Sequence, residues 1–140
     1  MKQYVQLSLM GIDPKTLTER LGIQPTAFAV AGQERRPGVF WRHHRWELRT
    51  DAAETEFDTE AHFRKLLEQI RPHINAIREL KDVEKAVSWV VEVGPDEQTP
   101  IGVISPGTLA ALHEIGVHLN VSLYFDAGSG FVETVIPFPA

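Results

Sequence analysis

The sequence predicts an α+β fold: a single compact domain over residues 1–140, with a mixed or antiparallel sheet and helices on one face. Two observations predict it. Segments that alternate apolar and polar residues, as half-buried strands do, are separated by segments with apolar residues at helical spacing. Strands also follow one another directly, in the order β-α-β-β-α-β-α-β-β, which argues against a doubly wound parallel sheet.

The first quarter of the chain begins with an alternating strand at Tyr4–Met10. A helix is expected at Asp13–Leu21, because Asp13-Pro14 is a favourable helix start and Gly22 a favourable stop. A turn, a short strand and a basic loop are expected next, at Gln24–Thr26, Ala27–Ala31 and Gly32–Gly38.

An aromatic-rich strand is predicted over Val39–Thr50, and neither of its faces is purely apolar. One face carries Phe40, Arg42, His44, Trp46 and Leu48, and the other carries Trp41, His43, Arg45, Glu47 and Arg49. We expect Trp46 and Leu48 to point inward.

An acidic linker, Asp51–Asp58, precedes a long helical segment that Asp58 or Thr59 can cap. Its apolar stripe comprises Phe63, Leu66, Leu67 and Ile70, and beyond Pro72 it resumes with Ile74, Ile77 and Leu80. Because proline interrupts helices, the segment is either one kinked helix or two helices in series.

From Glu84 onward the pattern of apolar residues predicts a strand at Glu84–Val93, a helix from Ser105 to Gly116 and a strand over Val117–Phe125. Leu109, Leu112 and Ile115 form the apolar stripe of that helix. A hairpin turn at Asp126–Gly130 then leads to Phe131–Ile136, which we expect at an edge of the sheet, where a homodimer could form.

The two best-defined helix starts resemble each other, since Asp13-Pro14-x-Thr16-Leu17 aligns with Ser105-Pro106-x-Thr108-Leu109. A weak internal duplication would explain this. So would two helices that begin by the same capping rule, and we favour that second explanation.

Composition narrows the class of protein. The chain has no cysteine, which removes disulfides and thiolate chemistry, and no apolar run near the length of a membrane span. The N-terminal residues do not resemble a signal peptide, so a cytoplasmic location is expected. The net charge of −5 argues against a dedicated nucleic-acid binder.

Several motifs together resemble a bacterial family of domains of unknown function, family 4279. They are Leu21-Gly22-Ile23-x-Pro25-Thr26, a glycine-bearing basic loop, Trp46-Glu47-Leu48, Leu66-Leu67-x-x-Ile70 and Ser105-Pro106-x-x-Leu109-x-x-Leu112-x-x-x-Gly116, followed by Leu123-Tyr124. The resemblance spans nearly the whole chain and implies a small bacterial cytoplasmic domain. It implies no activity and no catalytic residues.

The strongest candidate for a functional site is the segment from Gln33 to Arg49. Five arginines and two glutamates give it a charge of +3, so the rest of the chain carries −8. Arginine forks pair with phosphate or carboxylate, and flat rings stack on ligands. The predicted binding residues are Arg36, Trp41, His43, Arg45 and Arg49. The alternative is an ordinary exposed strand whose arginines pair with acids of Asp51–Glu60.

No catalytic or metal-binding motif is present. His43 and His44 are adjacent on the predicted strand and would face opposite ways, and no His-Glu-x-x-His or nucleophile motif occurs. We therefore expect no cofactor and no metal; whether the protein is an enzyme stays open, and we favour a protein without enzymatic activity.

Our first hypothesis is a binding or interaction protein, immunity-like or regulatory, with an unknown protein partner. The alternative is an enzyme or sensor for a small anion or nucleotide, with Arg36, Arg42 and Arg45 as clamps and His43 or His44 as proton carrier. A third reading, single-stranded nucleic acid, requires arginines and aromatic residues on one open sheet face.

Overall fold

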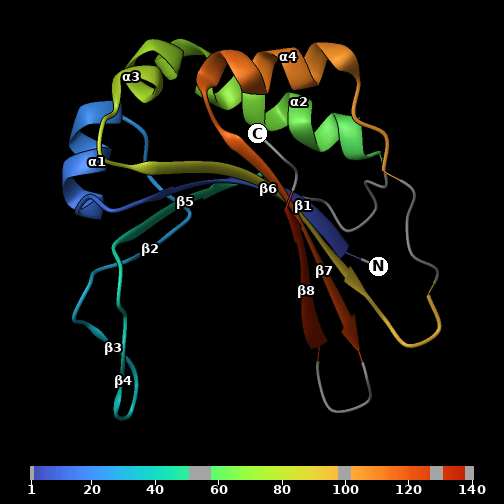
Figure 1. Cartoon of the computed structure of the whole chain (residues 1–140), viewed down its shortest axis with the longest axis horizontal. Helices are drawn as coiled ribbons and strands as arrows, with labels where there is room; N and C mark the ends of the chain where they lie inside the picture. Colours follow the sequence, from blue (N-terminus) through green and yellow to red (C-terminus); the bar gives the residue numbers. More distant parts are fainter. Residues whose placement is uncertain (1, 51–57, 98–101, 127–130, 138–140) are drawn as a thin grey trace.

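A six-stranded sheet is the framework of the protein in the computed structural model, which describes residues 2–50, 58–97, 102–126 and 131–137, the last seven and Asp126 through their backbone only. The strand order is β2-β5-β1-β6-β7-β8. All four helices lie on one face of the sheet (Figure 1). The predicted α+β class is confirmed.

Four of these strands form a ferredoxin-like arrangement. β1 (Lys2–Met10) pairs antiparallel with both β5 (Arg45–Arg49) and β6 (Glu84–Val93), and β2 (Ala27–Ala29) pairs antiparallel with β5. Helix α1 (Pro14–Leu21) connects β1 to β2, and a helical segment connects β5 to β6. This is the β-α-β-β-α-β pattern in which each helix links two parallel strands that have a third strand between them.

The sheet continues beyond β6 through a second kind of connection. Helix α4 (Pro106–Ile115) leads to β7 (His118–Asp126), which pairs parallel with β6, and β8 (Phe131–Pro137) pairs antiparallel with β7. The sheet is therefore mixed, and β8 forms its edge, as predicted for Phe131–Ile136. Because α1 joins strands separated by β5 whereas α4 joins direct neighbours, the two similar helix starts serve different pairings.

The two helices begin and end as their sequences predict. The Asp13 carboxylate accepts a 2.9 Å hydrogen bond from Lys15 N–H, and Ser105 Oγ accepts one of 3.2 Å from Thr108 N–H. Gly22 and Gly116 follow the last turns with φ of 69° and 78°, a left-handed conformation that glycine adopts without steric cost.

The segment between β5 and β6 contains two helices in series, so that alternative is confirmed. Helix α2 (Thr59–Ile70), capped by Asp58, is followed by the 3₁₀ turn η1 (Arg71–His73) around Pro72, and then by α3 (Ile74–Glu79). Proline cannot donate the hydrogen bond that would continue α2, so the chain tightens and redirects there.

The core lies between the helices and one face of the sheet. Trp46 and Leu48 point inward as predicted. They belong to one core with the inward-pointing alternate residues of β1 and β6. Phe63, Leu66 and Ile70 of α2 cover them. Two expectations are wrong: Leu109 and Phe40 are 46% and 57% exposed, because the first lies on the outer side of α4 and the second outside the main sheet.

A two-stranded ribbon replaces two predicted elements. Strands β3 (Glu34–Arg36) and β4 (Val39–Phe40) pair with each other, where a loop over Gly32–Gly38 and one continuous strand over Val39–Thr50 were expected. The chain leaves β4 at Trp41 and enters β5 at Arg45. His44 stabilises the chain at this break through two hydrogen bonds. Its Nδ1 accepts one from Ala31 N–H at 3.2 Å, and its carbonyl oxygen accepts one from Gly11 N–H at 3.3 Å.

Glu60 joins the starts of α2 and α4. Its carboxylate accepts hydrogen bonds from the backbone N–H of Ser105 and, at 2.8 Å, from the Thr108 hydroxyl. The Ser105 N–H lowers the pKa of Glu60 from its ordinary value, against an opposing effect of desolvation, and the Thr108 hydroxyl adds to the lowering.

The predicted acidic linker up to residue 57 and the turn over 127–130 lie outside the described residues.

Candidate functional site

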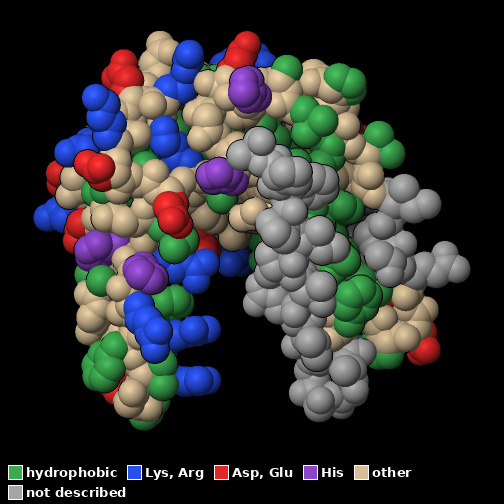
Figure 2. Space-filling model, viewed as in Figure 1, with side chains coloured by type: hydrophobic (Ala, Val, Ile, Leu, Met, Phe, Trp, Pro, Cys, Tyr) green, Lys and Arg blue, Asp and Glu red, His purple; other side chains and the backbone are tan. Residues whose placement is uncertain are grey.

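The sheet face opposite the helices is the floor of a hollow of about 530 Å³. The β3–β4 ribbon projects from the sheet on one side of this space, and β7 and β8 extend on the other (Figure 1). In Figure 2 positively charged side chains extend from the ribbon into the space beneath the sheet. The volume lies within the range of about 300–1,000 Å³ that is usual for small-molecule sites.

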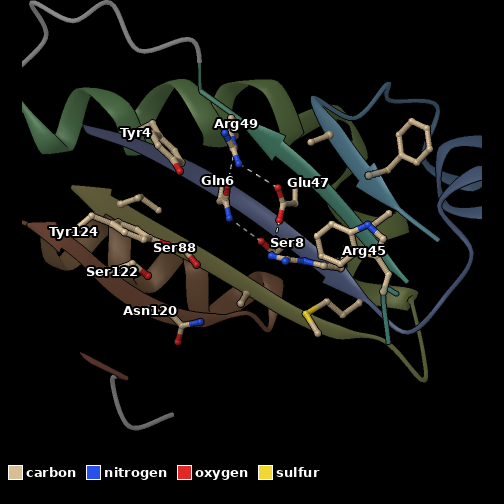
Figure 3. Close-up of a pocket in the computed structure, with 17 residues that line it drawn as sticks. Tyr4, Gln6, Ser8, Arg45, Glu47, Arg49, Ser88, Asn120, Ser122 and Tyr124 are labelled. Atoms are coloured by element: carbon tan, nitrogen blue, oxygen red, sulfur yellow. Dashed lines mark hydrogen bonds and ion pairs between the residues drawn. The ribbon is translucent and has the colours of Figure 1, made fainter. Parts of the chain in front are cut away.

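Three charged side chains of β5 form a row along this hollow (Figure 3). Arg45, Glu47 and Arg49 are alternate residues of one strand, so they share the face opposite Trp46 and Leu48. Glu47 accepts from the Arg45 guanidinium at 2.7 Å and pairs with the Arg49 guanidinium at 3.4 Å. We call these three residues the arginine row.

Gln6 of β1 extends the row across the sheet. Its side-chain oxygen accepts a 3.0 Å hydrogen bond from Arg49 Nε, and its amide nitrogen donates to Ser8 Oγ at 3.3 Å. These bonds fix the Arg49 guanidinium toward the hollow, so a ligand would meet it in one orientation.

The arginine row carries a net charge of +1, since two guanidinium groups flank one carboxylate. Glu47 is only 7% exposed, whereas the side chains of Arg45 and Arg49 are 37% and 41% exposed. Arg45 Nε is buried without a hydrogen-bond partner among the described residues. The row therefore presents donors to the hollow and screens its only negative charge.

Aromatic rings lie at both ends of the arginine row. The Arg49 guanidinium carbon is 4.9 Å from the centre of the Tyr4 ring. At the other end the guanidinium carbons of Arg35 and Arg45 are 4.7 Å and 5.6 Å from the centre of the Trp41 ring. Cation–π attraction thus holds each guanidinium against a flat surface.

Small polar side chains line the rest of the floor. Ser88 lies opposite Gln6 in the pairing of β1 with β6, and Asn120 lies opposite Ser88 in the pairing of β6 with β7. Ser122 and Tyr124 follow on the same face of β7 (Figure 3). Short side chains leave room above the sheet, and their hydroxyl and amide groups can both donate and accept.

Three of the five predicted site residues meet at the hollow: Trp41, Arg45 and Arg49. Arg36 and His43 do not line it. Arg36 is exposed on β3, and His43 faces a separate shallow depression beside Gly11. His43 also lines a neighbouring depression together with Trp41 and Arg45.

Among the described residues, the ion pairs of Arg45 and Arg49 lie within β5. Arg45 and Arg49 pair with Glu47 of their own strand, and Asp58 pairs with Arg64 of α2 at 3.6 Å. Residues 51–57 of the acidic segment lie outside the described residues.

Sequence reasoning missed Tyr4, Gln6 and Ser88 as site residues. The alternation within a strand predicts which residues share a face, yet it gives no reason to connect the faces of β1, β6 and β7 with Arg45 and Arg49. The missing information was the order of strands in the sheet.

Within the described ranges, no group of three or more histidine, aspartate or glutamate side chains is arranged to hold a metal ion. No helix in the described part of the chain is long and apolar enough to cross a membrane.

Fold and hollow together define the protein as an α+β domain with an open, polar sheet face. The chain belongs to the family described as domain of unknown function DUF4279, whose sequence profile matches residues 1–126. This confirms the resemblance found in the sequence. No curated protein and no solved structure matches the chain.

Proposed function

We propose that this protein is a ligand-binding domain that takes a small anionic ligand into the hollow beneath its sheet. The observation that carries the proposal is the convergence of Arg45 and Arg49 with the Trp41 ring on one concave face. Arginine at a partly enclosed site pairs with carboxylate or phosphate through two parallel hydrogen bonds.

The surroundings of the arginine row favour binding over simple surface charge. Hydrogen bonds to Glu47 and Gln6 hold both guanidinium groups in place, which reduces the entropy lost when a ligand is bound. The hydroxyl and amide groups of Ser88 and Asn120 can orient polar parts of the same ligand.

The recess favours a small molecule over a protein surface. A small ligand can enter the space between the ribbon and the opposite strands directly, whereas a globular partner would have to insert a segment there to contact the floor of the hollow. We propose a regulatory, non-enzymatic role in the cytoplasm, in which occupancy of the hollow is the signal.

The test is titration with adenosine 5′-monophosphate and inorganic pyrophosphate, followed by calorimetry and amide NMR shifts. We expect saturable binding with shifts at Gln6, Ser88 and Asn120. Arg49→Gln should weaken it about 10-fold or more, since a hydrogen bond to a charged group contributes about 1.5–3 kcal/mol.

Arg64→Gln is the matched control, because Arg64 is 64% exposed on α2 and lies on the helix-covered side. Arg49→Lys keeps the charge and loses the fork, which separates charge from geometry. If neither anion binds, or if Arg49→Gln and Arg64→Gln bind equally well, the proposed function is wrong.

A further inference from the structure

We infer that the ligand is a dinucleotide: two bases joined through a single phosphodiester, with one base at each end of the arginine row. This inference rests on the proposed function and specifies its ligand class. Three features carry it: the length of the row, the rings at its two ends and its charge.

The length of the site exceeds what one nucleotide can span. Arg49 lies opposite Gln6 and Arg45 opposite Met10, and Tyr4 lies one step further out than Gln6 on the same face of β1. From Tyr4 to Met10 is six residues, or about 20 Å along a strand. A base with its own sugar and phosphate reaches from one end only to the arginines, whereas a dinucleotide reaches both ends.

Each end offers a flat surface for a base. Tyr4 and Tyr124 lie at the Arg49 end of the hollow (Figure 3), and Trp41 lies at the Arg45 end. Bases stack on aromatic rings and on guanidinium planes irrespective of sequence. The hydroxyl and amide groups between the ends, at Ser88 and Asn120, suit the hydroxyls of two sugars.

The charge of the row matches one phosphodiester. Its net +1 balances a monoanion, and a phosphate monoester at neutral pH would bring additional negative charge close to Glu47. The +3 of residues 33–49 is confined to this region, while the rest of the chain carries −8. The basic region is therefore short, which favours a ligand of two nucleotides over a long nucleic acid.

The experiment compares adenylyl-(3′→5′)-adenosine, adenosine 5′-monophosphate and deca-adenylate by calorimetry at two salt concentrations. We expect the dinucleotide to bind about 5- to 150-fold tighter than the monophosphate, because stacking of a second base contributes about 1–3 kcal/mol. Trp41→Ala should weaken dinucleotide binding more than monophosphate binding, so the ratio of the two affinities should fall toward one. Phe40→Ala, an exposed ring of the same ribbon outside the hollow, is the control and should change neither affinity.

Each other outcome overturns the inference in a distinguishable way. Equal affinities for dinucleotide and monophosphate, both weakened by Arg49→Gln, would leave the proposed function intact and refute the dinucleotide. Deca-adenylate offers several overlapping dinucleotide sites, so it should bind somewhat more tightly than the dinucleotide for statistical reasons alone. An affinity for deca-adenylate above that statistical gain, with a steep salt dependence, would indicate a protein that binds single-stranded nucleic acid and would refute the dinucleotide. Absence of binding by all three, with pyrophosphate still bound, would refute the dinucleotide and leave the proposed function intact; absence of pyrophosphate binding as well would refute both proposals.

Discussion

The Trp89 indole N–H donates a 2.9 Å hydrogen bond to the side-chain oxygen of Gln3, and this bond joins residues 86 positions apart. The same oxygen accepts from the Thr59 hydroxyl at 3.2 Å. One glutamine, only 3% exposed, therefore links β1, β6 and the first residue of α2 on the covered side of the sheet.

Replacing Gln3 should be costly for stability. Gln3→Leu leaves the Trp89 N–H and the Thr59 hydroxyl without this acceptor in a buried site, which should lower the free energy of unfolding by about 1–3 kcal/mol. Urea denaturation monitored by tryptophan fluorescence measures the change. Lys2→Leu, at the exposed neighbouring position, is the control; a similar loss in both variants would contradict this assignment.

Gly102 should tolerate no side chain. A Cβ at this position would lie 2.2 Å from the Cη2 atom of Trp89, so Gly102→Ala must displace a buried ring. We expect a loss of about 1–3 kcal/mol in the free energy of unfolding. Gly107→Ala, in the first turn of α4 with no atom closer than 3.9 Å to the added carbon, should be neutral or stabilising. Equal melting temperatures for the two variants would refute the prediction.

Glu60 should make stability depend on pH. Its pKa is lowered in the folded state, so its contribution is present above the unfolded value near 4.5 and is lost as the pH falls through the lower folded value. The difference in stability between the natural protein and Glu60→Gln should therefore be largest at neutral pH and shrink on acidification below 4.5. Thermal melts at several pH values measure it, with Glu68→Gln on the exposed side of α2 as the control. A constant difference across this range would contradict the assignment.

Glu47→Gln should change binding and stability in opposite directions. Removing the carboxylate raises the charge of the arginine row from +1 to +2, so pyrophosphate should bind about 3- to 10-fold tighter. The two arginines lose a charged acceptor, so unfolding should become easier by about 1 kcal/mol or more. Calorimetry and urea denaturation on the same sample test both. Weaker anion binding in a folded variant would contradict this prediction and show that the positioning of the two arginines by Glu47 outweighs its charge.

Elements with one buried face could be predicted from the sequence, because burial on one side imposes a visible alternation. The prediction that Trp46 and Leu48 point inward is confirmed for this reason. The β3–β4 ribbon was not found, since Glu34–Arg36 is exposed on every side and no periodicity marks it.

The candidate site could be predicted only where its residues are close in sequence. Trp41, Arg45 and Arg49 were found within one segment, whereas Gln6 and Ser88 reach them through long-range strand pairing that local patterns do not encode. The break at Trp41–His44 changes the direction of the chain, and no local pattern indicates it; it shows in the bonds of His44 to Ala31 and Gly11.

The central position of β1 has a consequence for biosynthesis. β1 is translated before both of its neighbours, and its pairing with β6 joins Lys2 to Glu92. Until residues 84–93 have left the ribosome, the nascent chain holds Val5, Leu7 and Leu9 without the partner that completes their side of the sheet. The sheet can therefore form only after most of the chain has been synthesised. The slow step of folding should be the formation of the long-range pairing between β1 and β6, and a chaperone would bind the exposed apolar residues before that step.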